Sequence, residues 1–156
     1  GGRGWGGGVR GGAVSRGGRG APGEAAAGRQ RVDVSYGCPG AHGGRIGGAL
    51  RGLTPHVPVS VVHWFMGADG WTFAEGEGVV PDPDGAALLR DVYLRHDPKF
   101  TGKVTVPILW DTQDKRIVNN ESREIIRMFD TSFLGSGDPH VTLAPAPLQH
   151  AHHTVT

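Results

Sequence analysis

Glycine restricts how this chain can fold more than any other feature, because its glycines are spread very unevenly. Of the 156 residues 28 are glycine, and thirteen of those glycines lie within the first thirty positions. Glycine loses more conformational entropy on folding than other residues and brings no side chain to a core. We therefore expect residues 1–30 to be disordered, and we expect one modest domain over residues 31–134.

Two Arg-Gly-Gly pieces, at Arg10 and Arg16, resemble parts of RNA-binding tails. The net charge of +1 gives no wider electrostatic case for nucleic acid, and we interpret residues 1–30 as a spacer. The chain also has no run of eighteen apolar residues and no secretory signal pattern near its start. We therefore expect no nucleic-acid partner and no membrane partner. The single cysteine suits a reducing compartment, which predicts a cytoplasmic location.

Seven segments of the expected domain have the patterns of regular secondary structure. The predicted strands cover residues 32–36, 57–65, 103–110 and 117–118. The predicted helices cover residues 39–53, 84–96 and 121–133. Asp84 and Asn120 are the expected caps of the later two helices, and Pro39 favours the start of the first. Residues 135–156 show no periodic pattern, and we expect them to be disordered.

The order strand, helix, strand, helix, strand, strand, helix predicts an α/β protein with a thioredoxin-like fold. This fold has a mixed four-stranded sheet with flanking helices. Cys38 lies at the first strand–helix junction, and Pro107 lies within the third strand. Both positions fit the expected topology.

Cys38 is the residue most suited to chemistry. Unpaired N–H groups and the helix dipole stabilise a thiolate at a helix N-terminus, and the thiolate is the nucleophilic form. A buried, inert cysteine is the alternative interpretation. The chain has no second cysteine, so a dithiol mechanism is excluded and an external thiol must resolve any mixed disulfide.

Two further segments predict ligand contacts. In thioredoxin folds a cis proline faces the thiol loop, and the backbone of the preceding residue, here Val106, can pair with an extended peptide such as glutathione. Glu121 and Ser122 open a predicted helix, where N–H groups and a hydroxyl can bind a carboxylate. Plain helix capping explains the Glu-Ser pair equally well.

Four stretches of the domain have distinctive sequences, which read VSYGCPGAH, SVVHWFMGADGWTFAEGEGVVPDP, FTGKVTVPILWD and IVNNESREIIRMF. They resemble the glutathionyl-hydroquinone reductases, the xi-class glutathione transferases, over about residues 20–134. The resemblance is to the N-terminal, thioredoxin-like half of that family.

The resemblance implies that Cys38 is the nucleophile, in the position of the family's Cys-Pro-Trp-Ala-His motif. It also implies glutathione contacts from Trp71, Lys103, Val104, Thr105, Val106, Glu121 and Ser122. Glutathione is the implied co-substrate, glutathionyl-hydroquinones are the implied substrates, and no metal is expected. Members of the family form homodimers, and the resemblance leaves the oligomeric state of this chain open.

The chain departs from the family in two respects. The family has a second, helical domain, and the 23 residues after Phe133 are too few to form one, so we expect a fragment or a decayed copy. In the first predicted helix glycine replaces larger family residues at Gly40, Gly43, Gly44, Gly47 and Gly48. We expect His42 to pack within its loop, and we expect the tail histidines His150, His152 and His153 to bind no metal.

The expected function is therefore glutathione-dependent, one-cysteine reduction of glutathionyl-hydroquinones. Three alternatives stay open: a catalytically inactive glutathione-binding fragment, a glutaredoxin-like enzyme that deglutathionylates proteins, and an RNA-binding protein that uses residues 1–30.

Overall fold

A computed structural model of the chain describes residues 27–133, 135–143 and 145. The expected disorder of residues 1–26 and 146–156 lies outside the described residues. Within them the strands are β1 (Gln30–Ser35), β2 (Val59–Val62), β3 (Ile108–Asp111) and β4 (Arg116–Asn119). The helices are α1 (Pro39–Leu50), α2 (Leu89–His96) and α3 (Ser122–Thr131).

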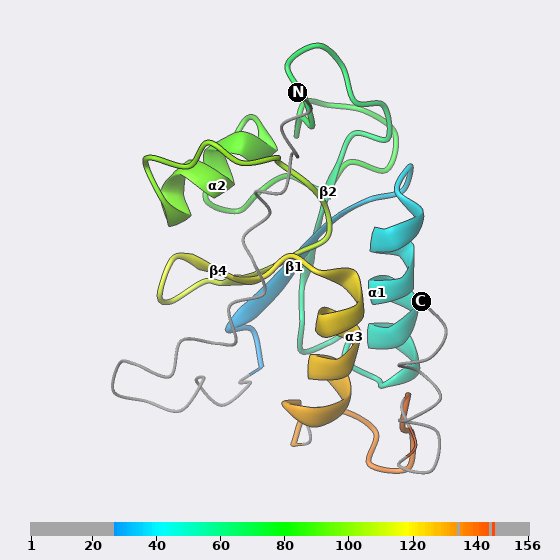
Figure 1. Cartoon of the computed structure of the whole chain (residues 1–156). Helices are drawn as coiled ribbons and strands as arrows, with labels where there is room; N and C mark the ends of the chain where they lie inside the picture. The colour runs from blue at the N-terminus through cyan, green and yellow to red at the C-terminus, as the bar shows by residue number, and fades with distance from the viewer. Residues whose placement is uncertain (1–26, 134, 144, 146–156) are drawn as a thin grey trace, which may run out of the picture.

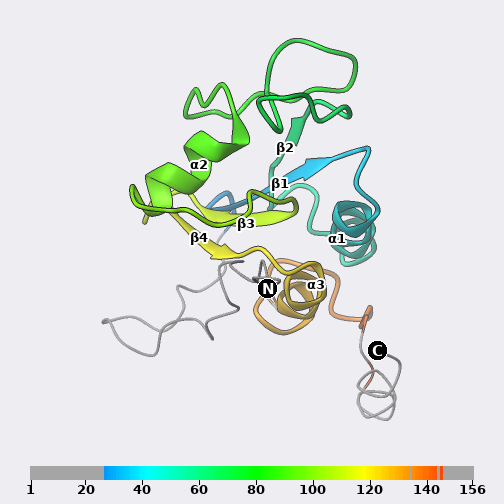
Figure 2. The ribbon, with the colours of Figure 1, turned by 45° about the horizontal axis from the view of Figure 1, so that its top comes forward.

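The four strands form one mixed sheet in the order β2-β1-β3-β4. β1 pairs with β2 in parallel and with β3 in antiparallel register, and β3 pairs with β4 in antiparallel register. Figures 1 and 2 show α1 and α3 side by side on one face of this sheet and α2 on the other. The predicted thioredoxin-like fold, with its mixed four-stranded sheet and flanking helices, is confirmed.

Alternating residues of β1 contribute to an apolar core on one face of the sheet and to a buried group of charged residues on the other. Val32 and Val34 belong to the apolar core of the domain, while Arg31 and Asp33 are equally buried but charged. Successive side chains of a strand point to opposite faces, so the two pairs serve opposite sides of the sheet. Because both faces of β1 are covered by helices, the strand is buried throughout its length.

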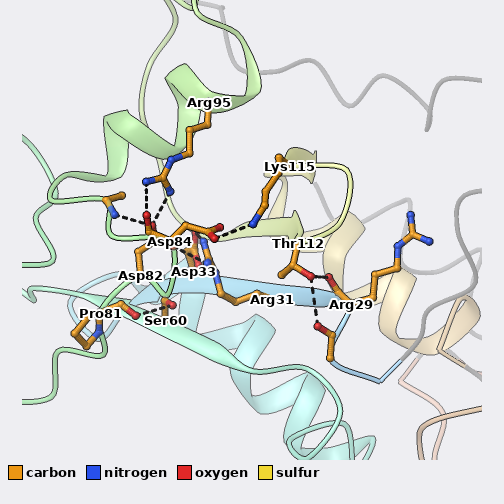
Figure 3. A network of polar contacts seen from close by, with 12 residues as sticks. Arg29, Arg31, Asp33, Ser60, Pro81, Asp82, Asp84, Arg95, Thr112 and Lys115 are labelled. Atoms are coloured by element: carbon orange, nitrogen blue, oxygen red, sulfur yellow. Dashed lines mark hydrogen bonds and ion pairs between the residues drawn. The ribbon is translucent and has the colours of Figure 1, made fainter.

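The charged residues of β1 form a buried ion network with the loop that leads into α2 (Figure 3). Arg31 binds Asp33 through Nε–Oδ1 at 2.7 Å and Asp82 through Nη1–Oδ1 at 2.6 Å. Arg95 of α2 completes the network at 2.7 Å from Asp82. Burial raises the pKa of Asp33 to about 6, although Arg31 acts in the opposite direction.

α2 and β3 are shorter than predicted, because the residues expected at their starts take other conformations and contacts. The helix expected over 84–96 begins at Leu89, since Gly85 has a φ of 76° and the Ala86 N–H donates to Asp82 at 2.8 Å. Asp84 is therefore not the cap, and its carboxylate pairs with Lys115 at 2.7 Å. The strand expected over 103–110 begins at Ile108, because proline has no N–H to donate to a sheet.

The remaining elements differ from the sequence prediction by a few residues. The second strand is limited to Val59–Val62, and the first helix ends at Leu50 rather than at residue 53. β4 is longer than the predicted pair of residues, and β1 begins at Gln30, within the segment expected to be disordered. The domain limits 1–30, 31–134 and 135–156 stay predictions.

Beyond α3, the described residues turn back onto α1 and α3. The guanidinium of buried Arg51 donates to the carbonyls of Asp138 and Val141. The Leu143 N–H donates to the Asp130 carboxylate at 3.0 Å. These hydrogen bonds join residues 138–143 to the two helices that carry the site described below.

Candidate functional site

Cys38 is the N-cap residue of α1, with Pro39 directly after it in the first turn. The thiol is partly exposed, and Sγ donates a long hydrogen bond of 3.7 Å to the carbonyl of Val106. The predicted cis bond between Val106 and Pro107 is confirmed. The structure therefore places the thiol next to the main-chain segment where the sequence predicts pairing with a peptide.

Cys38 makes no side-chain hydrogen bond to the first turn of α1. The N–H groups of a first turn have no partner within the helix, and they carry the positive end of the helix dipole. Donors of this kind can bind an anionic group that lies beside the start of the helix. The junction position predicted from Pro39 is confirmed in this respect.

The N-terminus of α3 contributes the second part of the site. Glu121 is the N-cap residue, and Ser122 is the first residue of the helix. Asn119 shapes the turn before them, because its Oδ1 accepts the Glu121 N–H at 2.7 Å and its Nδ2 donates to Glu124 at 2.5 Å. The predicted cap, Asn120, is wrong: its side chain is directed instead to Tyr93.

The two helix N-termini meet at Gly40, which lies between the thiol and the serine. A methyl group added at Gly40 would lie 3.9 Å from Cys38 Sγ and 3.8 Å from Ser122 Oγ. Cys38, Val106 and Ser122 are therefore brought together from three separate parts of the sequence. An elongated ligand with a thiol at one end and a carboxylate at the other suits this arrangement.

The other predicted ligand residues lie around these three without a demonstrated contact to a ligand. Val104 and Thr105 are partly buried ahead of Val106, and Lys103 is exposed. Trp71 lies in the loop between β2 and α2, packed against the core, and its carbonyl accepts the Leu89 N–H at 2.9 Å. The roles of these residues in binding stay predictions.

His42 is exposed on α1, so the expectation that it packs within its loop is wrong. Among the described residues, no group of three or more histidine, cysteine, aspartate and glutamate side chains is arranged to hold a metal. No helix of the described part is long and apolar enough to cross a membrane. The tail histidines from residue 150 onwards lie outside the described residues.

Comparison with known proteins places this geometry in a family. The sequence profile of the glutathione S-transferase N-terminal domain matches residues 37–132. The chain belongs to the glutathione S-transferase family. The matched range begins one residue before the thiol and ends just after α3, so it contains the whole of the site described above.

Relatives within this glutathione S-transferase family carry the name that the sequence motifs suggested. The glutathionyl-hydroquinone reductase PcpF of Sphingobium chlorophenolicum is 50% identical over 107 residues, which are 68% of this chain and 34% of the relative. YqjG of Escherichia coli, also named a glutathionyl-hydroquinone reductase, is 43% identical over 126 residues, covering 78% of this chain and 38% of the relative. The resemblance is thus confirmed, and the chain spans about a third of the length of these relatives.

Solved structures give the same result. The xi-class enzyme from Natrialba magadii matches with a TM-score of 0.77 at 46% identity, covering 80% of this chain and 40% of that one. A structure of Escherichia coli YqjG described as glutathione-bound matches with a TM-score of 0.77 at 38% identity, over 82% of this chain and 42% of that one. Both support the glutathione transferase fold seen here, and the first is described as a xi-class protein.

Two polar residues of the site are not among the predicted ligands. Asn119 and Asn120 make side-chain hydrogen bonds that hold the turn before α3. Their sequence signal is the pair of successive asparagines before Glu121, of which only Asn120 is interpreted from the sequence, as a cap. A pair of polar residues directly before a helix is therefore a sequence signal for hydrogen bonds that support the helix N-terminus.

Proposed function

We propose that this chain binds glutathione and uses Cys38 in one-cysteine reduction of glutathionyl-hydroquinones. The observation that carries the proposal is the convergence of Cys38, Val106 and Ser122 at one place, with the two helix N-termini directed to it. The names of PcpF and YqjG supply the substrate class. A cytoplasmic location and a homodimeric assembly are further parts of the proposal.

In the proposed complex, glutathione extends from Val106 to the N-terminus of α3. The main chain of Val106 pairs with the cysteinyl residue of the tripeptide, which brings the ligand sulfur next to Cys38 Sγ. The γ-glutamyl carboxylate lies at Glu121 and Ser122, where first-turn N–H groups and the serine hydroxyl can donate to it. Trp71 and residues 103–105 complete the binding surface.

The reaction proceeds by two exchanges at sulfur. The Cys38 thiolate attacks the sulfur of a glutathionyl-hydroquinone, the carbon–sulfur bond breaks, and the ring carbon takes a proton to give the hydroquinone. Cys38 is then joined to glutathione in a mixed disulfide. The thiolate of a second glutathione attacks the glutathionyl sulfur of this bond, which releases glutathione disulfide and restores the Cys38 thiolate. In the net reaction, one glutathione and the glutathionyl group of the substrate are joined as glutathione disulfide, and this oxidation supplies the two electrons that reduce the carbon–sulfur bond.

The proposal is tested first by the mixed disulfide. The full chain is treated with glutathione disulfide and analysed by mass spectrometry, beside Cys38→Ser. We expect one glutathione adduct on the wild-type chain and none on the variant. A folded wild-type chain that forms no adduct would contradict glutathione chemistry at Cys38.

A second assay measures release of hydroquinone from a glutathionyl-hydroquinone. Ser122→Ala should slow adduct formation by roughly tenfold, because a hydrogen bond to a charged group contributes about 1.5–3 kcal/mol. Release of hydroquinone by the wild-type chain would support the proposed reductase reaction. An adduct without any release would favour the inactive glutathione-binding alternative, and efficient deglutathionylation of a protein substrate would favour the glutaredoxin-like one.

One structural feature favours the inactive alternative as the second candidate. Gly40 has no side chain between Cys38 and Ser122, at the position where the resembling family has a tryptophan. A substrate ring would therefore lack an aromatic wall beside the thiol, and catalysis depends on holding the reacting atoms about 3–3.5 Å apart and aligned. Glutathione binding needs only the contacts that remain.

A further inference from the structure

We propose that Tyr93 is a positioning residue, whose hydroxyl holds the two ends of the glutathione site at a set separation. The inference rests on the proposed function, because it concerns the same site. Tyr93 lies on α2, across the sheet from α1 and α3, and none of its surface is exposed. It is therefore not a ligand of the substrate, and it acts only through the segments that it binds.

The hydroxyl of Tyr93 makes hydrogen bonds to two separate segments. It donates to the carbonyl of Thr105 at 2.9 Å, and it accepts the N–H of the same residue at 3.2 Å. It also accepts the side-chain amide of Asn120 at 3.2 Å. The Thr105 hydroxyl lies 3.3 Å away as well. One phenol oxygen thus joins residue 105 to residue 120.

These bonds use the full capacity of the group. A phenol has one hydrogen to donate and two lone pairs with which to accept. The Thr105 carbonyl takes the hydrogen, and the Thr105 N–H and the Asn120 amide fill the acceptor positions. Replacement by phenylalanine would leave three polar groups without this partner, and the cost of such groups rises with their burial.

The ring and the hydroxyl of Tyr93 have different partners. The ring packs on Phe100 with centroids 4.8 Å apart, within a helix face that also buries Leu89 and Val92. Phenylalanine would satisfy that packing equally well. Packing in the apolar core therefore does not require the hydroxyl, whose contribution is its hydrogen bonds to the two segments.

Each bonded residue directly precedes a part of the proposed glutathione site. Thr105 precedes Val106, whose carbonyl faces the Cys38 thiol. Asn120 precedes Glu121, the N-cap residue of α3. The segment proposed to bind the cysteinyl residue and the segment proposed to bind the γ-glutamyl carboxylate are thus hydrogen-bonded to the same oxygen atom. Misplacement of a bound group by about 1 Å can cost roughly a hundredfold in rate, so this link controls how well both ends are held together.

The test compares two reactions of Cys38 in the full chain. Glutathione disulfide offers both the peptide and the carboxylate, whereas 2-hydroxyethyl disulfide offers only a disulfide bond. In each reaction the Cys38 thiolate forms a mixed disulfide and one thiolate leaves, and mass spectrometry gives the rate. We expect Tyr93→Phe to slow the reaction with glutathione disulfide about tenfold and to leave the reaction with 2-hydroxyethyl disulfide within about twofold.

Two variants accompany Tyr93→Phe. Asn120→Ala removes one of the three hydrogen bonds from a partly exposed position, so it tests the inference even where Tyr93→Phe fails to fold. We expect it to lower the rate with glutathione disulfide, relative to the rate with 2-hydroxyethyl disulfide, about three- to fivefold. Tyr36→Phe is the matched control, because Tyr36 is 46% exposed and its ring lies beneath the Arg45 guanidinium. Both of its rates should equal those of the wild type.

The outcomes separate this inference from the proposed function. Equal slowing of both reactions in Tyr93→Phe and Asn120→Ala would show a general structural role and would overturn the positioning role. A wild-type preference for glutathione disulfide that both variants retain would overturn it too, while the proposed function would stand. A wild-type chain with no preference for glutathione disulfide would overturn both.

Discussion

α1 and α3 meet at the same site, yet they are built from opposite kinds of sequence. Five of the twelve residues of α1 are glycine, whereas α3 has no glycine and buries Ile125 and Phe129 against the core. Each glycine in a helix interior costs about 1 kcal/mol relative to alanine. The helix that begins at the thiol is therefore weak by itself, and the helix that begins at the proposed carboxylate site is strong.

The contacts between the helices explain how α1 nevertheless forms. Positions for a methyl group at Gly43 and Gly48 lie 3.5 Å from side-chain atoms of Ile126 and Phe129. Arg51, at the end of α1, donates to the Phe129 carbonyl at 3.4 Å. Most helical stability in proteins comes from packing rather than from propensity. We infer that α1 depends on α3, and the following predictions test that dependence.

Phe129→Ala should have the largest effect. Phe129 is 2% exposed, and its ring packs edge-on against Phe133 with centroids 5.5 Å apart. Removing a buried phenylalanine ring costs about 3–5 kcal/mol, comparable with the whole stability of a small domain. Urea unfolding followed by circular dichroism measures the loss. Arg127→Ala, on the exposed side of α3, is the control and should change stability by less than about 0.5 kcal/mol.

The same variant also tests the link to the thiol. If α1 depends on α3, Phe129→Ala should change the rate at which Cys38 reacts with iodoacetamide under conditions where wild-type protein is folded. An unchanged Cys38 rate together with a stability loss below about 1 kcal/mol would show that α1 stands without α3.

Replacing Asp33, on the face of the sheet that α2 covers, should alter stability without changing the packing of α1 against α3. The pKa of Asp33 is about 6 in the folded protein, against 3.8 for the unfolded side chain. Between about pH 4 and 6 the folded state therefore binds more protons than the unfolded state, so the contribution of Asp33 becomes less favourable as pH rises. The change is on the order of 2 kcal/mol between pH 4 and 7.

Asp33→Asn isolates this contribution. The free energy of unfolding of the wild type minus that of the variant should fall between pH 4 and pH 7, measured by urea unfolding at each pH. Hydrogen bonds from Ala86 and Arg95 hold the pKa of Asp82 low against the effect of burial, so Asp82 stays ionised over this pH range and adds little to the pH dependence of the difference. A difference that stays constant with pH would contradict the assignment.

Gly44→Ala should have the smallest effect and the opposite sign. Nothing lies within 4 Å of a methyl group added at Gly44, which is in the middle of α1. Alanine there should raise the free energy of unfolding by about 1 kcal/mol. Gly47→Ala is the matched comparison, since its methyl group would lie 3.3 Å from Leu143 and should gain less. A loss of stability in Gly44→Ala, measured by thermal melting, would contradict the account of α1.

The main elements of the fold follow from local patterns in the sequence. The alternation of β1, the apolar spacing of α3 and the position of Pro39 predicted three elements within a few residues. The strand–helix junction predicted at the lone cysteine is also found, with Cys38 as the N-cap of α1. Such features are visible locally because strand and helix periodicity, and the preference of proline for a first turn, depend only on neighbours in the sequence.

The exact start of α2 and the role of Asn120 depend on residues that are distant in the sequence. Asp82 lies against Arg31 of β1 and Arg95 of α2, and it also takes the Ala86 N–H, so residues 82–88 form turns before the helix. Asn120 lies beside Tyr93, which is 27 positions earlier, and donates its side-chain amide to it, while the helix begins one residue later than predicted with Glu121 as the N-cap. Where a polar side chain has two possible partners, the fold determines which of them lies close enough for a hydrogen bond.

The sequence by itself therefore determined which segments become strands and helices and where the thiol lies. Only the tertiary structure decided that a helix with five glycines persists, because α3 and residues 138–143 supply the packing and hydrogen bonds that α1 lacks. It also decided how closely Cys38, Val106 and Ser122 lie to one another. Local preference acts over a few residues, whereas the packing that joins these three segments acts between residues up to 84 positions apart.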